Sequence, residues 1–238
     1  MGALLLSLKP LLDPVGGMAA AVSARKWFMP LLILAGVTSA SGAVLSSRTD
    51  MSRVVIPKME MSGQLGKASE REITEEIEQS ERIGLVGSIA LGVFAMPMLV
   101  LGLAVLLKAL AWLVGRKALF SATFSTAAVG LLPIAILRLI TLFAASRQSL
   151  LSPDVAMSLV PTSLSDVFHG EHSAPVARAL GAVNVFNVWS VLLVGLGFAA
   201  ATDIKPWRAL LLCLFVYTLL AGAVSVGLPG LMPPGGPS

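Results

Sequence analysis

The sequence has little charge for its length. Asp, Glu, Lys and Arg make up 13% of its 238 residues, whereas soluble globular domains carry about 25%. Hydrophobic residues make up 56%, and the mean hydropathy is +0.87. This balance excludes an ordinary soluble domain and predicts a polytopic membrane protein. The net charge of +4, with no basic patch interleaved with aromatic residues, argues against nucleic-acid binding.

Cysteine is nearly absent as well. The single residue, Cys213, lies in the apolar run LLCLFVY, which excludes an intrachain disulfide and a multi-cysteine metal site. We interpret it as a small buried or lipid-facing residue. The sequence also lacks a G-x-S-x-G motif, a P-loop and paired carboxylates within its apolar runs. These absences predict a protein with no cofactor and no catalytic activity.

Five apolar runs remain, each long enough to cross a bilayer, which takes about 20 residues as a helix. The fold class is therefore all-α, with five transmembrane helices and a short N-terminal interfacial helix. Polar loops are predicted at 48–82 and 147–177, and a disordered tail at 227–238. The predicted spans are 27–47, 84–115, 118–146, 179–202 and 207–226.

Residues 1–26 precede the first span and carry a helix start. Asp13 is suited to the N-cap and Pro14 to the first helical position. Apolar side chains follow on one face, so a short helix lying in the membrane interface is expected. A disordered segment is the alternative, because Gly16 and Gly17 weaken a helix. The face consists of Val15, Met18, Ala19 and Val22.

Two spans carry small residues at every fourth position, a spacing that lets two membrane helices approach closely. In the first span the ladder is Ala35, Ser39, Ala43 and Ser47, and in the second it is Gly84, Ser88 and Gly92. These ladders predict helix packing, either between the two spans or against a partner protein.

Two cations lie inside the spans, Lys108 and Arg138. Charge in hydrocarbon is costly, so such residues are candidates for contact with a lipid phosphate or an anionic substrate. Both also lie near a span end, so they can instead extend to the headgroups. The same two spans contain Pro97 and Pro133, which predict kinks.

The polar loops contain two clusters of possible ligands. In 48–82, Ser69 and Glu72 match a capping box, so the second helix should begin outside the membrane, with its run of Glu residues as a solvated face. In 147–177, a metal site is one interpretation and an exposed loop the other, because H-x-E-H fits no metal-binding spacing on a helix. The candidate ligands are Asp166, His169, Glu171 and His172.

Tryptophans and basic residues gather at one set of span ends. Trp27, Trp112 and Trp207 fall there as interfacial anchors. The nearby basic residues favour a cytosolic N-terminus and an external C-terminus in a bacterial cytoplasmic membrane. These residues are Lys9, Arg25, Lys26, Arg116, Lys117, Lys205 and Arg208.

The assembled pattern resembles the Yip (Ypt-interacting protein) domain family of five-span membrane proteins, in its bacterial branch, over residues 8–226. The resemblance rests on Asp13-Pro14, the RKWFMPLLIL entry to the first span, the hairpin around Gly115 and the stretch NVFNVWSVLLVGLGF. In that stretch Phe186, Trp189, Gly195 and Gly197 look like the family's aromatic and glycine positions. The D-L-Y-G-P signature of the eukaryotic branch is absent, so that branch's Rab-binding role does not carry over.

The resemblance implies an integral membrane protein with a cytosolic N-terminus and no catalytic activity. Our leading hypothesis is a membrane-organising or adaptor protein that binds membrane lipids or other membrane proteins through its small-residue faces. The alternative is a small permease or lipid-handling protein with a cavity between spans two and three. A metal-dependent membrane enzyme at His169 and His172 is the third reading. The sequence does not define the oligomeric state.

Overall fold

The computed structural model describes residues 8–153, 155, 159–164, 180 and 183–226. Helices make up 80% of this part of the chain, and its only β pairing is two isolated bridges, Thr49 with Leu151 and Ser163 with Asn184. The all-α fold class is confirmed. The helices are α2 (Pro14–Ser23), α3 (Phe28–Arg48), α4 (Ser52–Met61), α5 (Glu70–Ala90), the π-turn η1 (Leu91–Ala95), α6 (Met96–Leu113), α7 (Phe120–Gly130), α8 (Leu132–Ser146), α12 (Val185–Thr202) and α13 (Pro206–Val226).

Five helical segments are long and apolar enough to cross a membrane, as predicted: Phe28–Arg48, Glu70–Leu113, Phe120–Ser146, Val185–Thr202 and Pro206–Ala223. The second helix begins at Glu70, directly after the predicted capping residue Ser69, so its start before the apolar span agrees with the prediction. The start of the fourth span differs, because α12 begins at Val185 rather than near residue 179. Asn184 caps α12 by accepting a hydrogen bond from the backbone N–H of Asn187 at 2.7 Å.

The chain divides into two compact units. Unit 1 comprises residues 1–30, 100–134 and 161–238, and unit 2 comprises residues 31–99 and 135–160. The chain passes between them four times, and each passage lies within two residues of a proline: Pro30, Pro97, Pro133 and Pro161.

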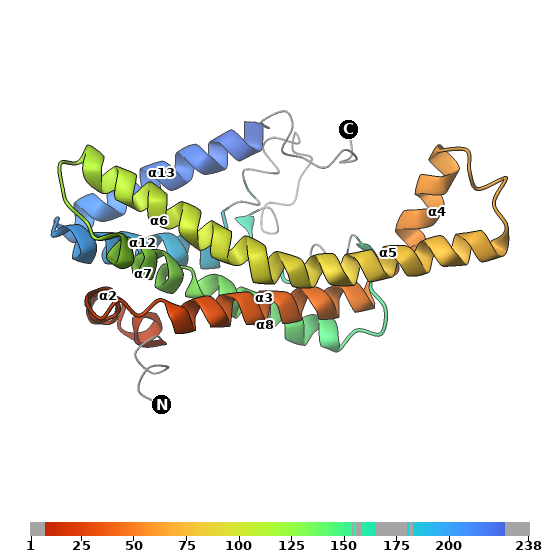
Figure 1. Cartoon of the computed structure of the whole chain (residues 1–238), viewed down its shortest axis with the longest axis horizontal. Helices are drawn as coiled ribbons and strands as arrows, with labels where there is room; N and C mark the ends of the chain where they lie inside the picture. The colour runs from red at the N-terminus through yellow and green to blue at the C-terminus, as the bar shows by residue number, and fades with distance from the viewer. Residues whose placement is uncertain (1–7, 154, 156–158, 165–179, 181–182, 227–238) are drawn as a thin grey trace. The chain divides into compact units, whose positions relative to one another are not determined.

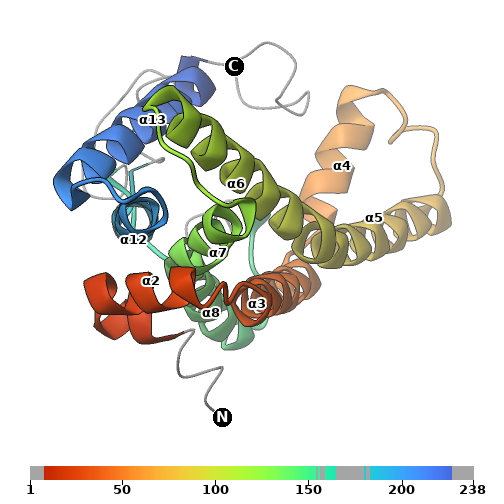
Figure 2. The ribbon, with the colours of Figure 1, turned by 60° about the vertical axis from the view of Figure 1, so that its left-hand side comes forward.

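In unit 1, α12 is the central helix and packs against α2, α7 and α13. Figure 1 shows that α12 and α13 form an antiparallel hairpin, and Figure 2 shows α12 nearly end-on beside α7 and α2. Close packing depends on two glycines of α12. A Cβ on Gly195 would lie 3.1 Å from the Cα of Leu210, and one on Gly197 would meet Thr126 of α7 at 2.7 Å.

The short helix α2 confirms the predicted start, because Asp13 accepts a hydrogen bond from the Gly16 N–H at 3.0 Å. Its predicted apolar face is split, because Met18 and Val22 are buried whereas Val15 and Ala19 are exposed. The buried side chains pack against α7 and α12. The position of α2 in the membrane interface stays a prediction. The buried residues of α2 are Gly17, Met18, Ala21 and Val22.

Gly17 explains why the two glycines do not prevent α2 from forming. A Cβ at this position would lie 2.6 Å from the Cα of Pro10, so the close approach of the preceding segment requires glycine. The C-terminal end of α2 and the turn after it contact α7 through Ser125. The Ser125 hydroxyl lies 3.1 Å from the carbonyl oxygen of Ala21 and 3.3 Å from that of Lys26.

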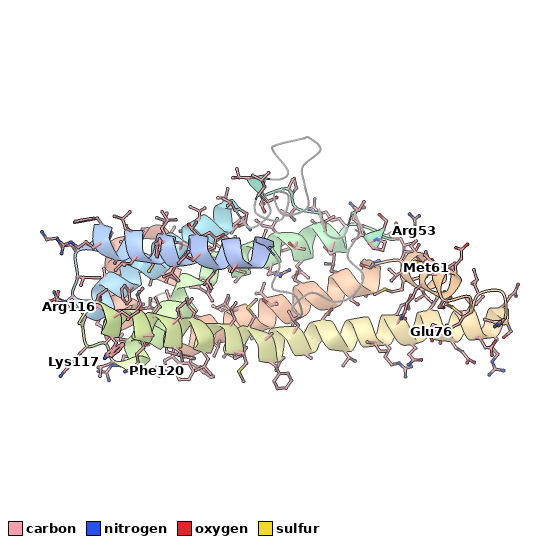
Figure 3. The ribbon with its side chains drawn as sticks, turned by 90° about the horizontal axis from the view of Figure 1, so that it is seen from above. Arg53, Met61, Glu76, Arg116, Lys117 and Phe120 are labelled. Carbon is pink, nitrogen blue, oxygen red and sulfur yellow. The ribbon has the colours of Figure 1, made fainter. Side chains whose placement is uncertain are left out.

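Unit 2 contains a helix in the predicted polar loop 48–82: α4, whose sequence SRVVIPKMEM contains Pro57. Val55 and Met59 of α4 are buried, and α4 packs against α5. Figure 3 shows Arg53 and Met61 on α4 and Glu76 on α5. The predicted capping box is confirmed: Ser69 accepts from the Glu72 N–H, and Glu72 accepts from the Ser69 N–H at 2.7 Å.

Both prolines in the second and third spans coincide with irregular backbone. Pro97 has no N–H to donate to the carbonyl of Val93. The π-turn η1 precedes it, and the Met96 N–H donates to the carbonyl of Leu91, five residues back. In the third span α7 ends at Gly130, and α8 begins at Leu132 with Pro133 in its first turn. Pro133 therefore starts a helix, which its fixed φ favours.

Candidate functional site

The clearest packing feature of unit 2 is the contact between α3 and the helix α5–η1. The π-turn brings Gly92 so close to α3 that a Cβ there would lie 2.5 Å from the backbone nitrogen of Ser39. The Ser39 hydroxyl donates to the carbonyl of Ile89 at 3.1 Å. Ile89 lies two residues before the π-turn, and the change of hydrogen-bond register in the turn disturbs the usual helical partner of its carbonyl. The small side chain of Ser39 therefore allows Gly92 to approach, and its hydroxyl supplies a hydrogen-bond donor to the carbonyl of Ile89.

Two further contacts continue this interface toward the start of α5. A Cβ on Gly42 would lie 3.0 Å from the Cβ of Ser88, and one on Gly84 would lie 2.8 Å from the Oγ of Ser46. The second-span ladder Gly84, Ser88 and Gly92 thus packs within the protomer. Of the first-span ladder, only Ser39 takes part in these three contacts.

A second group of small residues on α3 forms a separate stripe. Its four residues are Gly36, Ala40, Ala43 and Ser47, and their spacing of four, three and four residues places them on one face of the helix. None of the four takes part in the contacts with α5 and η1 described above. Gly36, Ala40 and Ser47 are exposed and Ala43 is half-buried. A Cβ added to Gly36 would meet nothing within 4 Å. We call Gly36, Ala40, Ala43 and Ser47 the outer face of α3. Of the predicted ladder residues, Ala35 is half-buried elsewhere on the helix.

The two intramembrane cations have different surroundings. Lys108 of α6 is exposed, and its ammonium group donates to the carbonyl of Ala118 at 3.2 Å, in the turn that follows the helix. Its charge therefore lies toward the end of the span. Arg138 of α8 is half-buried, and its Nε has no hydrogen-bond partner in the described part of the chain.

The three predicted anchors all belong to unit 1, and all are exposed. Trp27 is 38% exposed, Trp207 56% and Trp112 77%. Trp27 lies edge-on to Phe124 of α7, with ring centroids 5.2 Å apart. The Arg208 guanidinium carbon lies 5.2 Å from the centre of the Trp207 ring, a cation–π arrangement. Figure 3 labels Arg116 and Lys117 at the end of this unit where α6 turns into α7.

Unit 1 also contains an apolar cavity of about 140 Å³ that is partly open to its surroundings. Three helices supply most of its wall, and the junction of α7 and α8 supplies the rest. Three polar residues line it, Asn187, Ser190 and Tyr217. Ser190 is 4% exposed, and its hydroxyl has no hydrogen-bond partner in the described residues. The apolar lining is Leu103, Leu106, Leu107, Leu110, Leu131, Ile134, Val191, Val194, Cys213, Val216 and Leu220.

These three polar residues were not among the predicted site residues. The sequence does contain a signal for two of them, because Asn187 and Ser190 lie one turn apart on the same face of an otherwise apolar run. Tyr217 is the only tyrosine in the chain. The cavity itself could not be predicted, because its wall combines helices that are distant in the sequence.

The candidate metal ligands Asp166, His169, Glu171 and His172 lie outside the described residues. Within the described residues, no group of three or more His, Cys, Asp or Glu side chains gathers. The glutamates at the start of α5, from Glu70 to Glu81, are all exposed, in agreement with a solvated face.

The five apolar helices and the small-residue contacts define a polytopic helical membrane protein. The family model of the Yip1 domain matches residues 9–227, nearly the whole sequence, and the chain belongs to this family. No curated protein and no solved structure matches it significantly.

Proposed function

We propose that this Yip1-domain protein is a membrane-organising or adaptor protein that binds a transmembrane helix of another protein. The outer face of α3 is the observation that carries the proposal. It offers small side chains along three helical turns, and within the described residues of unit 2 Gly36 and Ala40 are exposed.

A small-residue face favours a helix over lipid for a physical reason. Inside the bilayer, helix association depends on van der Waals contact and backbone approach, since lipid tails are as apolar as leucine. The same chemistry already operates within the protomer, where Gly92 and Gly42 allow α3 and α5–η1 to approach. The outer face presents the same residue types to its surroundings.

The proposed setting is the bacterial cytoplasmic membrane, with the N-terminus in the cytosol and the C-terminus outside. The basic turns and the tryptophans of unit 1 support this orientation. The proposal assigns no catalytic activity, no cofactor and no nucleic-acid partner. Membrane lipids and one or more membrane proteins are the proposed partners.

A pair of matched glycine substitutions tests the adaptor role. Gly36→Leu adds bulk to the outer face, whereas Gly222→Leu adds the same bulk to an exposed position of α13; a Cβ meets nothing within 4 Å at either site. After cross-linking in native membranes, we expect partner adducts with wild type and Gly222→Leu and a strong loss with Gly36→Leu. Recovery of only the monomer from wild-type membranes would contradict the proposal.

A lipid-handling protein or small permease is the second candidate, and the cavity in unit 1 is the observation that favours it. Residues from spans two and three contribute to its wall, together with spans four and five. Purified protein in vesicles that hold a fluorescent lipid in one leaflet tests it. Movement of that lipid between leaflets, lost when the cavity is filled, would support lipid handling, and no movement would exclude it.

A further inference from the structure

Helix α4 begins at the level where unit 2 leaves the hydrocarbon of the membrane. A Cβ on Gly84 of α5 would lie 2.8 Å from the Oγ of Ser46 of α3 and 3.1 Å from the Cε of Met51, the residue that precedes α4. The first charged residues outside the two apolar stretches, Arg48 and Arg82, each lie two residues beyond this contact. Since charged side chains are costly in hydrocarbon, this level marks the edge of the hydrocarbon core.

Helix α4 then runs across the direction of α3 and α5. Figure 1 shows α4 at a steep angle to α5, with the connection between the two on the side of α4 that is farther from α3. Ten residues make a helix about 15 Å long. A helix that continued in the direction of α3 would carry its end that far from the membrane, whereas a transverse helix stays near the headgroups. The whole of α4 therefore lies close to the edge of the hydrocarbon core.

One face of α4 is covered by the protein. Val55 and Met59 lie one turn apart and are buried, and α4 packs against α5. The chain reverses after α4 at Gly63, whose φ is 68°. The N–H groups of Gln64 and Leu65 then donate to the Met59 carbonyl at 2.9 and 3.2 Å, as in a Schellman cap. The connection to α5 therefore returns over the Met59 side of the helix.

The opposite face of α4 is apolar and exposed. Val54, Pro57 and Met61 share it, because they are three and four residues apart. Within the described residues of unit 2, Val54 is 44% exposed and Met61 is 84% exposed. The connection, which covers the other side, lies farther from α3 than α4 does (Figure 1). The apolar face is therefore turned back toward the level where α3 leaves the membrane.

Basic residues border this face on both sides. A helix turns about 100° per residue, which places Arg53 at one edge of the face and Lys58 at the other. Arg53 pairs with Asp50 at 3.2 Å, and Glu60 lies beside it on the same edge. Lys58 is exposed, and its ammonium group has no hydrogen-bond or ion-pair partner among the residues that the structure describes. An apolar face bordered by basic side chains is typical of helices that lie in a membrane interface.

We propose that α4 lies in the membrane interface, with Val54, Pro57 and Met61 among the upper acyl chains of phospholipids and the Lys58 ammonium group at a lipid phosphate. A phospholipid surface fits this face, because the face begins at the edge of the hydrocarbon core and continues along it. The proposal does not rest on the adaptor role of α3 or on the cavity of unit 1. It applies to the leaflet in which α3 ends, whichever way the chain is inserted.

The experiment uses the full chain with Cys213→Ser, at one copy per lipid nanodisc of phosphatidylcholine and phosphatidylglycerol. Both membrane faces are then open to solution, and no second copy can cover α4. A fluorescent NBD label is attached to Met61→Cys or, as the control, to Glu76→Cys; Figure 3 labels both positions. Glu76 is exposed on α5, eight residues before Gly84 and so about 12 Å beyond the membrane edge.

Two quenchers report where the label lies: a phospholipid with a nitroxide on carbon 5 of one acyl chain, and aqueous iodide. We expect the nitroxide lipid to quench the label at Met61→Cys about threefold more than the label at Glu76→Cys, and iodide to quench it about threefold less. Equal quenching at the two positions would overturn the proposal. Protection from iodide without quenching by the nitroxide lipid would also overturn it, because the chain itself would then cover the face.

A matched pair of substitutions on α4 tests which face meets the lipid. Val54→Asp charges the apolar face, whereas Ile56→Asp charges a position of similar exposure, 38%, on another side of the helix. In the labelled Met61→Cys protein, Val54→Asp should reduce quenching by the nitroxide lipid about threefold, and Ile56→Asp should leave it unchanged. Circular dichroism checks that each variant is helical. Equal effects of the two substitutions would overturn the assignment of the face.

A second pair tests the lipid phosphate contact. Lys58→Glu places a negative charge against the phosphates and should weaken the nitroxide quenching about twofold. Lys67→Glu makes the same change at an exposed position of the connection and should leave the quenching unchanged. Equal quenching in the two variants would overturn the role of Lys58.

Discussion

Gly92 of η1 lies against Ser39 of α3, with no room for a side chain between the two backbones. The hydrogen bond from Ser39 to the carbonyl of Ile89 spans the same contact. A π-turn is a rare helical irregularity that often marks a position under constraint. Here the π-turn lies where three residues of the sequence come together: Pro97, Gly92 and Ser39, which precedes Gly92 by 53 residues.

Adding bulk at Gly92 should therefore destabilise unit 2. Gly92→Leu forces the backbone of α3 away, and overpacking of this kind costs about 1–3 kcal/mol. Gly87→Leu is the control on the same helix, because a Cβ there meets nothing within 4 Å; it should be neutral or slightly stabilising, since leucine favours a helix over glycine. Thermal unfolding in mild detergent measures both. Similar unfolding temperatures for the two variants would show that the contact is not tight.

The hydroxyl of Ser125 gives a second prediction. Ser125 is fully buried and connects α7 to the carbonyls at the end of α2. Ser125→Ala removes this hydroxyl donor, which should cost about 0.5–1.5 kcal/mol, because the carbonyl of Ala21 keeps its hydrogen bond from the Lys26 N–H at 3.1 Å. Ser23→Ala removes an exposed hydroxyl that donates only within its own helix, to the carbonyls of Ala19 and Ala20, and should change stability by less than about 0.5 kcal/mol. Proteolysis between residues 24 and 28 should become faster in Ser125→Ala alone, if α2 is held as described.

Much of this fold could be predicted from patterns of residues that are close in the sequence. The caps at Asp13 and Ser69 and the apolar lengths of the spans follow from side chains close in the sequence, so they could be predicted. The α3 partners of the second-span ladder could not, because the π-turn rotates Gly92 onto Ser39 and the facing residues become Gly42 and Ser46 rather than Ala43 and Ser47. Helix α4 was not predicted because it lies in the stretch 48–82, which was interpreted as a polar loop. Ser190 was not predicted because it gains its place in the cavity wall only from helices distant in the sequence.

The connection between α3 and α4 should respond to acid. Asp50 accepts hydrogen bonds from the hydroxyl and the N–H of Ser52 and from Arg53 at 3.2 Å. The Ser52 hydroxyl is the main reason that the pKa of Asp50 lies below its ordinary value. A carboxylate with a lowered folded-state pKa stabilises the protein above its unfolded pKa, about 3.9, and this contribution disappears as the pH falls through the folded value.

Asp50→Asn should therefore lower the unfolding temperature at pH 7, and the difference from wild type should shrink as the pH falls below about 4. The difference should also be smaller in a Ser52→Ala background, because that variant lacks the main hydrogen-bond donor. Thermal melts of the four proteins at several pH values provide the measurement. A difference that stays constant from pH 7 to pH 3 would show that the charge of Asp50 contributes nothing.

The last prediction concerns the orientation of unit 1. The turns after α6 and after α12 lie at one end of this unit in Figures 1 and 3. Leu164 lies at the start of α12, since its N–H donates to the carbonyl of Val183 at 2.9 Å and the neighbouring Ser163 pairs with Asn184. The 18 residues of α12 then separate it from the turns by about 27 Å. The positive-inside rule places the turns, with Lys117 and Lys205, in the cytosol.

Single cysteines in a Cys213→Ser background make this separation measurable. Cells treated with a membrane-impermeant thiol reagent should label Leu164→Cys, which is exposed, and should spare Lys117→Cys until the membrane is permeabilised. Lys205→Cys should behave like Lys117→Cys, because both turns lie at one end of unit 1. The reverse pattern would mean that the protein is inserted the other way round, and labelling of all three from outside would mean that α12 does not cross the membrane.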